Sequence, residues 1–159
     1  MAVPGVKQRL AWNLVAEVGP TVDAFPSDAD LVSWAGICPG NNETVGKSGT
    51  TRNGNRWARK ALCEAAWAAS KTKATYLQAQ FRRLAAIRGS KRAIIAVAST
   101  ILTIGYHMLK QGTTYRELGG NYFDKRNLLR TTRRLVKRLE ALGHRVILAP
   151  TPSPFQSSD

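Results

Sequence analysis

Residues 93–109 read AIIAVASTILTIGYHML, a run of seventeen residues without a charged side chain. Lys91 and Arg92 precede this run, and Lys110 follows it. It falls just short of the roughly 20 apolar residues that a membrane-spanning helix needs. Bases at both ends also give no inside–outside asymmetry. We therefore predict a helix that is buried in a protein core, with a membrane-associated segment as the less favoured alternative.

Apolar residues recur with helical spacing on both sides of this run. Ser27, with Asp30 three residues later, predicts the start of one short helix. No run alternates apolar and polar residues well enough to indicate a sheet. The predicted fold is therefore all-α, a single multi-helix domain. We expect helices over residues 6–18, 27–35, 55–70, from Thr72 or Thr75 to Ile87, over residues 90–112 with Ser90 as the cap, and over residues 124–142.

Charge is distributed unevenly along the chain. The sequence carries 24 Lys and Arg against 10 Asp and Glu, a formal net charge of +14. The first 46 residues hold five acids and two bases, whereas residues 47–159 hold 22 bases and five acids. Such a balance predicts a polyanionic partner, either nucleic acid or an anionic membrane surface. We expect the part that binds it to begin near residue 47.

Residues 39–55, PGNNETVGKSGTTRNGN, are polar and hold four glycines. Loops of this length are usually functional or disordered, so we predict a long, basic, glycine-rich loop. A basic face at the start of the next helix, preceded by amides that glycine leaves exposed, suits a phosphate. A solvated basic surface is the alternative that composition leaves open. The candidate nucleic-acid-binding residues here are Lys47 and Arg52 in the loop and Arg56, Arg59 and Lys60 on one helix face.

The expected helix over residues 124–142 has leucines along one side and bases on the others. Eight bases and two acids lie between Asp124 and Arg145. An ordinary surface helix mixes the signs of its charges, so we favour nucleic-acid contact over a solvated surface. We assign the aromatic residues near the bases, Trp57, Tyr122 and Phe123, to packing and not to base stacking. The candidate binding residues are Lys125, Arg126, Arg130, Arg133, Arg134, Lys137 and Arg138.

Two cysteines and two histidines do not form a metal site of recognised spacing. A metal-dependent nuclease needs several converging carboxylates. The few acids of this chain are scattered along the sequence, and only Asp28 and Asp30 form a close pair. That pair suits the first turn of a helix, where acids complement the helix dipole. We therefore expect neither a metal site nor a cofactor in this chain. No signal peptide opens the sequence, and we expect cytoplasmic localisation.

Two motifs resemble those of a known family. One is LVSWAGICPGNNE over residues 31–43, and the other is GNRWARKAL over residues 54–62. In order and spacing they are similar to the C-terminal transposase domain of the insertion-sequence "one-ten" family, the bridge-RNA-guided, serine-dependent transposases. The resemblance is clear over residues 2–88. Residues 89–149 resemble a helical extension of that domain, and residues 150–159 have the composition of a disordered tail.

The resemblance implies a DNA recombination protein in two parts. In the family, an N-terminal RuvC-like domain binds Mg²⁺ through four carboxylates, and the C-terminal domain supplies a serine that attacks a DNA phosphodiester. This chain starts where the C-terminal domain would begin, so Mg²⁺ is expected only with a carboxylate domain elsewhere. Thr44 occupies the serine position, and its β-methyl group restricts the hydroxyl. Ser48, four residues away, is a second candidate nucleophile.

We therefore expect a DNA-binding C-terminal domain of an insertion-sequence transposase, truncated or separately translated, and inactive alone. The expected partners are DNA, a structured guide RNA, a RuvC-like domain on another chain if the element is split, and a second copy of this chain. No membrane partner is expected. The alternatives are an RNA-binding or repurposed nucleic-acid-binding helical protein without catalysis, and a peripheral protein on anionic membranes.

Overall fold

The computed structural model describes residues 3–38 and 54–149. These residues are helical and contain no strand, so the predicted all-α fold is confirmed. The chain divides into two compact units, residues 1–123 and residues 124–159. The helices are α1 (Gln8–Val18), α2 (Asp28–Trp34), α3 (Arg56–Lys71), α4 (Tyr76–Arg88), α5 (Ser90–Gln111), α6 (Tyr122–Arg126) and α7 (Leu128–Ala141).

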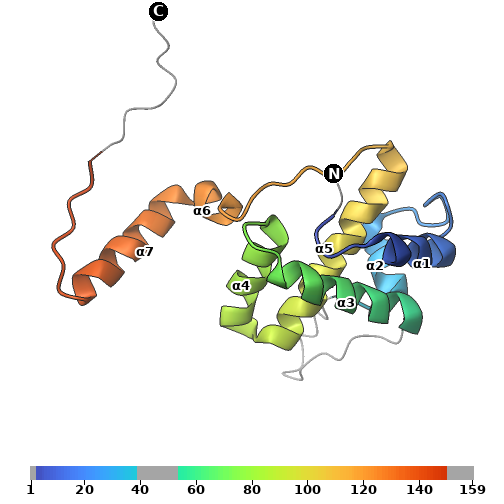
Figure 1. Cartoon of the computed structure of the whole chain (residues 1–159), viewed down its shortest axis with the longest axis horizontal. Coiled ribbons are helices and arrows are strands. Elements are labelled where there is room, and N and C mark those ends of the chain that lie inside the picture. Colours follow the sequence, from blue (N-terminus) through green and yellow to red (C-terminus); the bar gives the residue numbers. More distant parts are fainter. Residues whose placement is uncertain (1–2, 39–53, 150–159) are drawn as a thin grey trace, which may run out of the picture. The chain divides into compact units, whose positions relative to one another are not determined.

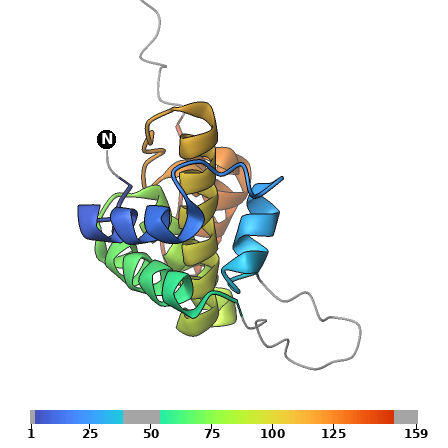
Figure 2. The same ribbon diagram turned by 90° about the vertical axis from the view of Figure 1, so that its right-hand side faces the viewer.

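Helix α5 is the central helix of the first unit. Seven of its residues are buried, and it packs against α2, α3 and α4. Figures 1 and 2 show it running through the middle of this unit, with the shorter helices around it. Its length and composition would also allow it to cross a membrane. In the structure its apolar side is covered by other helices, so the predicted buried core helix is confirmed.

Because α5 packs on α2, α3 and α4, it belongs to the same compact unit as α1 to α4. The unit extends to Phe123 and does not end at residue 88. The expected division between residues 2–88 and a helical extension concerns the domain of the family, and it stays a prediction. The expected tail, residues 150–159, and the expected loop from residue 39 to residue 53 lie outside the described residues.

Small residues on α3 allow the N-terminal segment to approach it closely. Alanine and leucine side chains form the buried stripe of this helix, and the turn before α1 lies against it. A Cβ atom on Gly5 would lie 2.3 Å from the carbonyl oxygen of Ala65, and Gly5 has a φ of +82°. Only glycine meets both conditions without strain. The turn at Gly5 therefore fixes where α1 lies along α3.

The helix starts follow local hydrogen bonding. The Ser27 hydroxyl accepts from the backbone N–H of Asp30 at 3.3 Å, and the Thr75 hydroxyl accepts from that of Gln78 at 3.3 Å. The predicted cap at Ser27 is confirmed, and of the two candidates Thr72 and Thr75 it is Thr75 that caps α4. The predicted cap at Ser90 is wrong, because Ser90 is the first residue of α5 and makes no cap hydrogen bond. Gly89 alone separates α4 from α5, with φ 79° and ψ 159°, and leaves no room for a serine cap.

A carboxylate fixes the chain after α5 against the start of α4. Glu117 Oε1 accepts hydrogen bonds from the backbone N–H groups of Tyr76 at 2.7 Å and Gly119 at 2.9 Å. Glu117 Oε2 accepts from the Tyr115 hydroxyl at 2.8 Å. Burial alone would raise the pKa of Glu117, but these hydrogen bonds hold it below its ordinary value. The pKa of Tyr115 is raised, by burial and by its bond to the carboxylate.

Glu117 is expected to make the protein sensitive to acid. A carboxyl group whose pKa is lowered by folding stabilises the protein above its unfolded pKa, about 4.3, and this stabilisation is lost as the pH falls through the folded value. Glu117→Gln should lower the free energy of unfolding by about 1–3 kcal/mol at neutral pH, because the buried Tyr115 hydroxyl loses the carboxylate oxygen that accepts its hydrogen bond. Urea unfolding from about pH 7 to about pH 3 measures both effects.

The control is Glu64→Gln, which changes an exposed side chain on α3. This variant should follow the pH dependence of the unchanged protein. If the stability of Glu117→Gln also fell with pH below about pH 4 as that of the unchanged protein does, the assigned role of the Glu117 carboxylate would be wrong.

Candidate nucleic-acid interface

Asn55 defines the start of α3. Its side-chain oxygen accepts from the backbone N–H groups of Trp57 and Ala58, each at 2.9 Å. Its amide nitrogen donates to Glu17 Oε2 at 2.6 Å, which ties the end of α1 to the start of α3. Asn55 thus occupies two of the amides at this helix start, and the glycine amides expected to hold a phosphate lie, apart from that of Gly54, outside the described residues.

The two chain segments on either side of residues 39–53 meet beside Asn55. The backbone N–H of Asn55 donates to the carbonyl oxygen of Trp34 at 2.9 Å. A Cβ atom on Gly54 would lie 2.2 Å from the backbone nitrogen of Gly36. The two glycines therefore pack backbone against backbone, and this contact places both ends of residues 39–53 at the start of α3. Thr44, Lys47, Ser48 and Arg52 lie outside the described residues.

A basic pocket of about 380 Å³ opens beside this contact. We call it the α3 pocket, and its walls are Gly54, Arg56, Arg59, Lys60 and Cys63. Three of the predicted binding residues thus come together, and their predicted shared helix face is confirmed. Three cations around one hollow surface suit a phosphate group.

The sulfur in the wall of the α3 pocket is unsuited to nucleophilic chemistry. Burial raises the pKa of the Cys63 thiol. The charge of Arg59 acts in the opposite direction and is the smaller effect, and the charge of Glu64 adds to the rise. A neutral thiol is a poor nucleophile at neutral pH. The described residues of the pocket therefore provide positive charge and no activated thiol nucleophile.

Trp57 does not pack as expected. Its side chain is 70% exposed. The buried stripe of α3 follows Ala58 and Leu62, and Trp57 lies about 140° around the helix from Leu62. The assignment of Trp57 to packing is wrong, and counting helix phase from Leu62 would have shown this from the sequence.

The other two aromatic residues near the bases pack as predicted. The rings of Tyr122 and Phe123 each lie 5.2 Å from the ring of Tyr76, between centroids. The Arg83 guanidinium lies 4.5 Å from the centroid of the Phe123 ring. Arg83 was not among the predicted residues, and its role here is to cover this aromatic cluster.

The second unit carries the remaining candidate residues, and all seven are exposed. The predicted single helix over residues 124–142 is wrong, because Asn127, with φ −130° and ψ 53°, separates α6 from α7. Lys125 and Arg126 end α6, and the other five bases lie on α7. Asp124 pairs with Arg134 at 3.9 Å. The leucines of α7 are exposed as well, so this helix has one apolar and one basic side.

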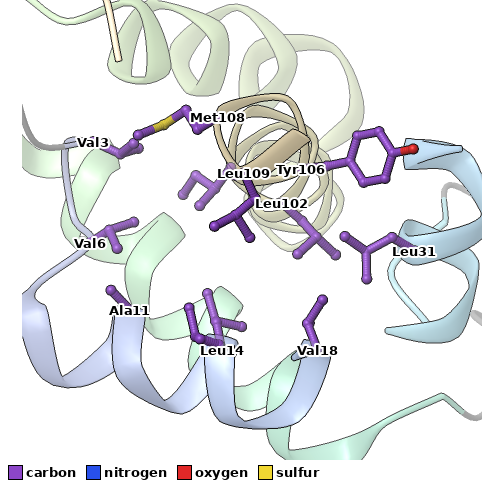
Figure 3. A pocket seen from close by; sticks show the side chains of 13 residues that line it. Val3, Val6, Ala11, Leu14, Val18, Leu31, Leu102, Tyr106, Met108 and Leu109 are labelled. Carbon is purple, nitrogen blue, oxygen red and sulfur yellow. The ribbon is translucent and has the colours of Figure 1, made fainter. Parts of the chain in front are cut away.

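A second cavity, of about 180 Å³, lies between α1, α2 and α5. Figure 3 shows aliphatic side chains from these three helices pointing into it, with Tyr106 at its edge. The Tyr106 hydroxyl is turned away to the carbonyl oxygens of Phe25 and Pro26, at 3.2 and 3.1 Å. An apolar wall offers a phosphate no donor, so this cavity does not suit nucleic-acid binding.

Acidic and metal-ligating residues do not gather in the described part of the chain. Within residues 3–38 and 54–149, no three His, Cys, Asp or Glu side chains lie close enough together to hold a metal ion. These residues therefore do not fit the Mg²⁺ site that the resemblance implies for a whole transposase. We derive no step through a metal from them.

Comparison with known proteins gives two matches. Residues 1–82 match the family model described as Transposase IS116/IS110/IS902 family. Over 124 residues the chain is 32% identical to a 43.6 kDa protein of insertion element IS110 from Streptomyces coelicolor. That alignment covers 72% of this chain, which spans only 29% of the length of the relative. No solved structure matches the chain.

Proposed function

The chain belongs to the IS116/IS110/IS902 transposase family, and from this premise we propose that it is the DNA-binding C-terminal region of an insertion-sequence transposase. The observation that carries the proposal is the α3 pocket, where Arg56, Arg59 and Lys60 surround one hollow. Family membership supports a role in transposition, and the pocket supplies the chemistry that DNA phosphates require.

The contact between Gly36 and Gly54 gives the α3 pocket its place in this function. It packs Gly36, which precedes residues 39–53, against Gly54, which follows them and lines the pocket. A phosphate held by the three bases would therefore lie next to the segment that contains Thr44 and Ser48. Positive side chains near a reacting phosphate would also stabilise the charge that develops on its oxygens.

Strand transfer is proposed only together with a carboxylate-bearing domain. We place the nucleophile at Thr44, with Ser48 as the second candidate, and Mg²⁺ on that other domain, in the same or another chain. Trapping a covalent adduct in its presence, with a guide RNA added, tests this. A larger yield of adduct in Thr44→Ser supports Thr44 as the nucleophile. An adduct that still forms in Thr44→Ala supports Ser48 as the nucleophile.

The exposed bases of α7 form a proposed contact surface of their own in the second unit. All five bases of this helix are exposed. Among the described residues, Arg134 pairs with Asp124, and the other four bases, including Lys137 and Arg138, form no ion pair. We propose that they contact DNA phosphates without reading its sequence. A protein with this role acts in the cytoplasm, where its DNA is, and we include that localisation in the proposal.

The salt dependence of DNA binding tests the function. Each phosphate that the protein neutralises should make the slope of log K against log salt steeper by about 0.9. Titrating a short duplex into the whole chain at several salt concentrations measures that slope. An affinity that does not change with salt would contradict the proposal.

A helical protein that binds structured RNA is the alternative, since RNA also presents phosphates. Competition between duplex DNA and a folded RNA for the same protein separates the two. A strong preference for the RNA at equal salt would favour this alternative.

A further inference from the structure

Trp57 differs from Trp34 and Trp67 in its surroundings. Trp34 and Trp67 each lie beside a phenylalanine, with ring centroids 5.5 Å and 6.0 Å apart. Trp57 has no aromatic neighbour among the described residues and is 70% exposed. Trp12, on α1, is similarly exposed at 66%, and neither tryptophan lines the α3 pocket, but Trp57 directly follows Arg56, which does. A single exposed tryptophan is common on protein surfaces, so what matters is what surrounds it.

The surroundings of Trp57 are basic. Arg56 precedes it in the chain, Lys60 lies one turn further along α3, and both line the α3 pocket. Of the carboxylates on neighbouring segments, Glu17 binds the Asn55 amide, and Glu64 lies seven residues further along α3. A phosphate in the pocket would therefore place the base of the same or the next nucleotide within reach of the indole.

We propose that Trp57 stacks on an unpaired base of a DNA strand whose phosphate lies in the α3 pocket. This inference rests on the proposed DNA-binding function and adds its substrate class, a DNA strand with unpaired nucleotides. Bases in a duplex already stack on their neighbours, and separating them has a free-energy cost that an unpaired base avoids. Stacking an unpaired base on an aromatic side chain strengthens binding about 10- to 100-fold, whatever the sequence.

The test compares Trp57→Ala with Trp12→Ala, which removes an equally exposed indole away from the pocket. Binding to a single strand and to a duplex of equal length is measured across a series of salt concentrations. Trp57→Ala should bind the single strand about 10- to 100-fold more weakly, with the salt slope unchanged, because stacking neutralises no phosphate. Trp12→Ala should bind as the unchanged protein does. Trp57→Phe, which keeps an aromatic ring, should recover most of the affinity.

The outcomes separate this inference from the function on which it rests. If the unchanged protein binds DNA with a steep salt slope but Trp57→Ala matches Trp12→Ala, stacking is wrong and the function stands. If the unchanged protein shows no salt-dependent binding of DNA, the function is wrong. A loss in Trp57→Ala that appears with single-stranded RNA and not with DNA overturns the DNA assignment.

Discussion

Gly54→Ala is expected to destabilise the first unit by roughly 3 kcal/mol, which is a large part of the stability of a domain of this size. The added Cβ atom would lie 2.2 Å from the nitrogen and 2.5 Å from the Cα atom of Gly36, and 2.5 Å from the carbonyl oxygen of Trp34. All three are backbone atoms, so no side chain can turn aside. The backbone must shift, and the hydrogen bond from Asn55 to Trp34 is strained with it.

The matched control is Gly105→Ala, in the interior of α5. A Cβ atom there would meet nothing within 4 Å. Alanine is favoured over glycine inside a helix, so this variant should stabilise the protein by about 0.5–1 kcal/mol. Chemical denaturation of the two variants and the unchanged protein measures the difference. Equal stability of all three would show that Gly36 and Gly54 are not in contact.

The triple variant Arg56→Ala, Arg59→Ala and Lys60→Ala is expected to bind DNA on the order of 100-fold more weakly. Each lost contact with a phosphate is worth about 1 kcal/mol. The slope of log K against log salt should also become shallower by about 2 to 3, because three fewer phosphates are neutralised. Titrations at several salt concentrations give both quantities from one set of data.

The matched control for this prediction is Lys7→Ala, Lys71→Ala and Lys73→Ala. It removes the same formal charge from exposed residues that do not line the α3 pocket. Overall charge alone would reduce binding equally in both variants. If DNA binds at the α3 pocket, the pocket variant should lose much more affinity than the lysine control. Equal losses of affinity in the two variants would count against the site.

Much of the first unit could be predicted from local patterns. Ser27 and Thr75 cap their helices because a hydroxyl at that position reaches a backbone N–H three residues later, and the sequence contains everything that this contact needs. The charge-free run in α5 is equally local, since its apolar residues recur at helical spacing over the whole length of the helix.

The interruption of the last predicted helix comes shortly after a contact between residues that are distant in the sequence. The leucines of residues 128–142 keep helical spacing, and nothing before them indicates a break at Asn127. Tyr122 and Phe123 are held by their packing on Tyr76, at the start of α4. A pattern within residues 124–142 contains no trace of that tertiary contact.

The candidate site could be predicted only in part, because some of its features are local in the sequence and others join distant segments. The spacing of Arg56, Arg59 and Lys60 on one helix is local and was sufficient to bring them together. The packing of Gly54 on Gly36 and the hydrogen bond from Asn55 to Glu17 join segments that are distant in the sequence. Charge and glycine content indicated a binding segment but not the partners that fix its two ends.

The packing of Gly36 against Gly54 also bears on how this protein can diverge. The chain leaves the helical core and returns to it at one point, so residues 39–53 are closed off by a contact outside themselves. Closing a loop costs only about 0.6 kcal/mol more for each doubling of its length. Insertions or deletions in residues 39–53, or exchange of these residues between relatives, should therefore leave the helices intact. Selection can then change residues 39–53 and the helical scaffold independently.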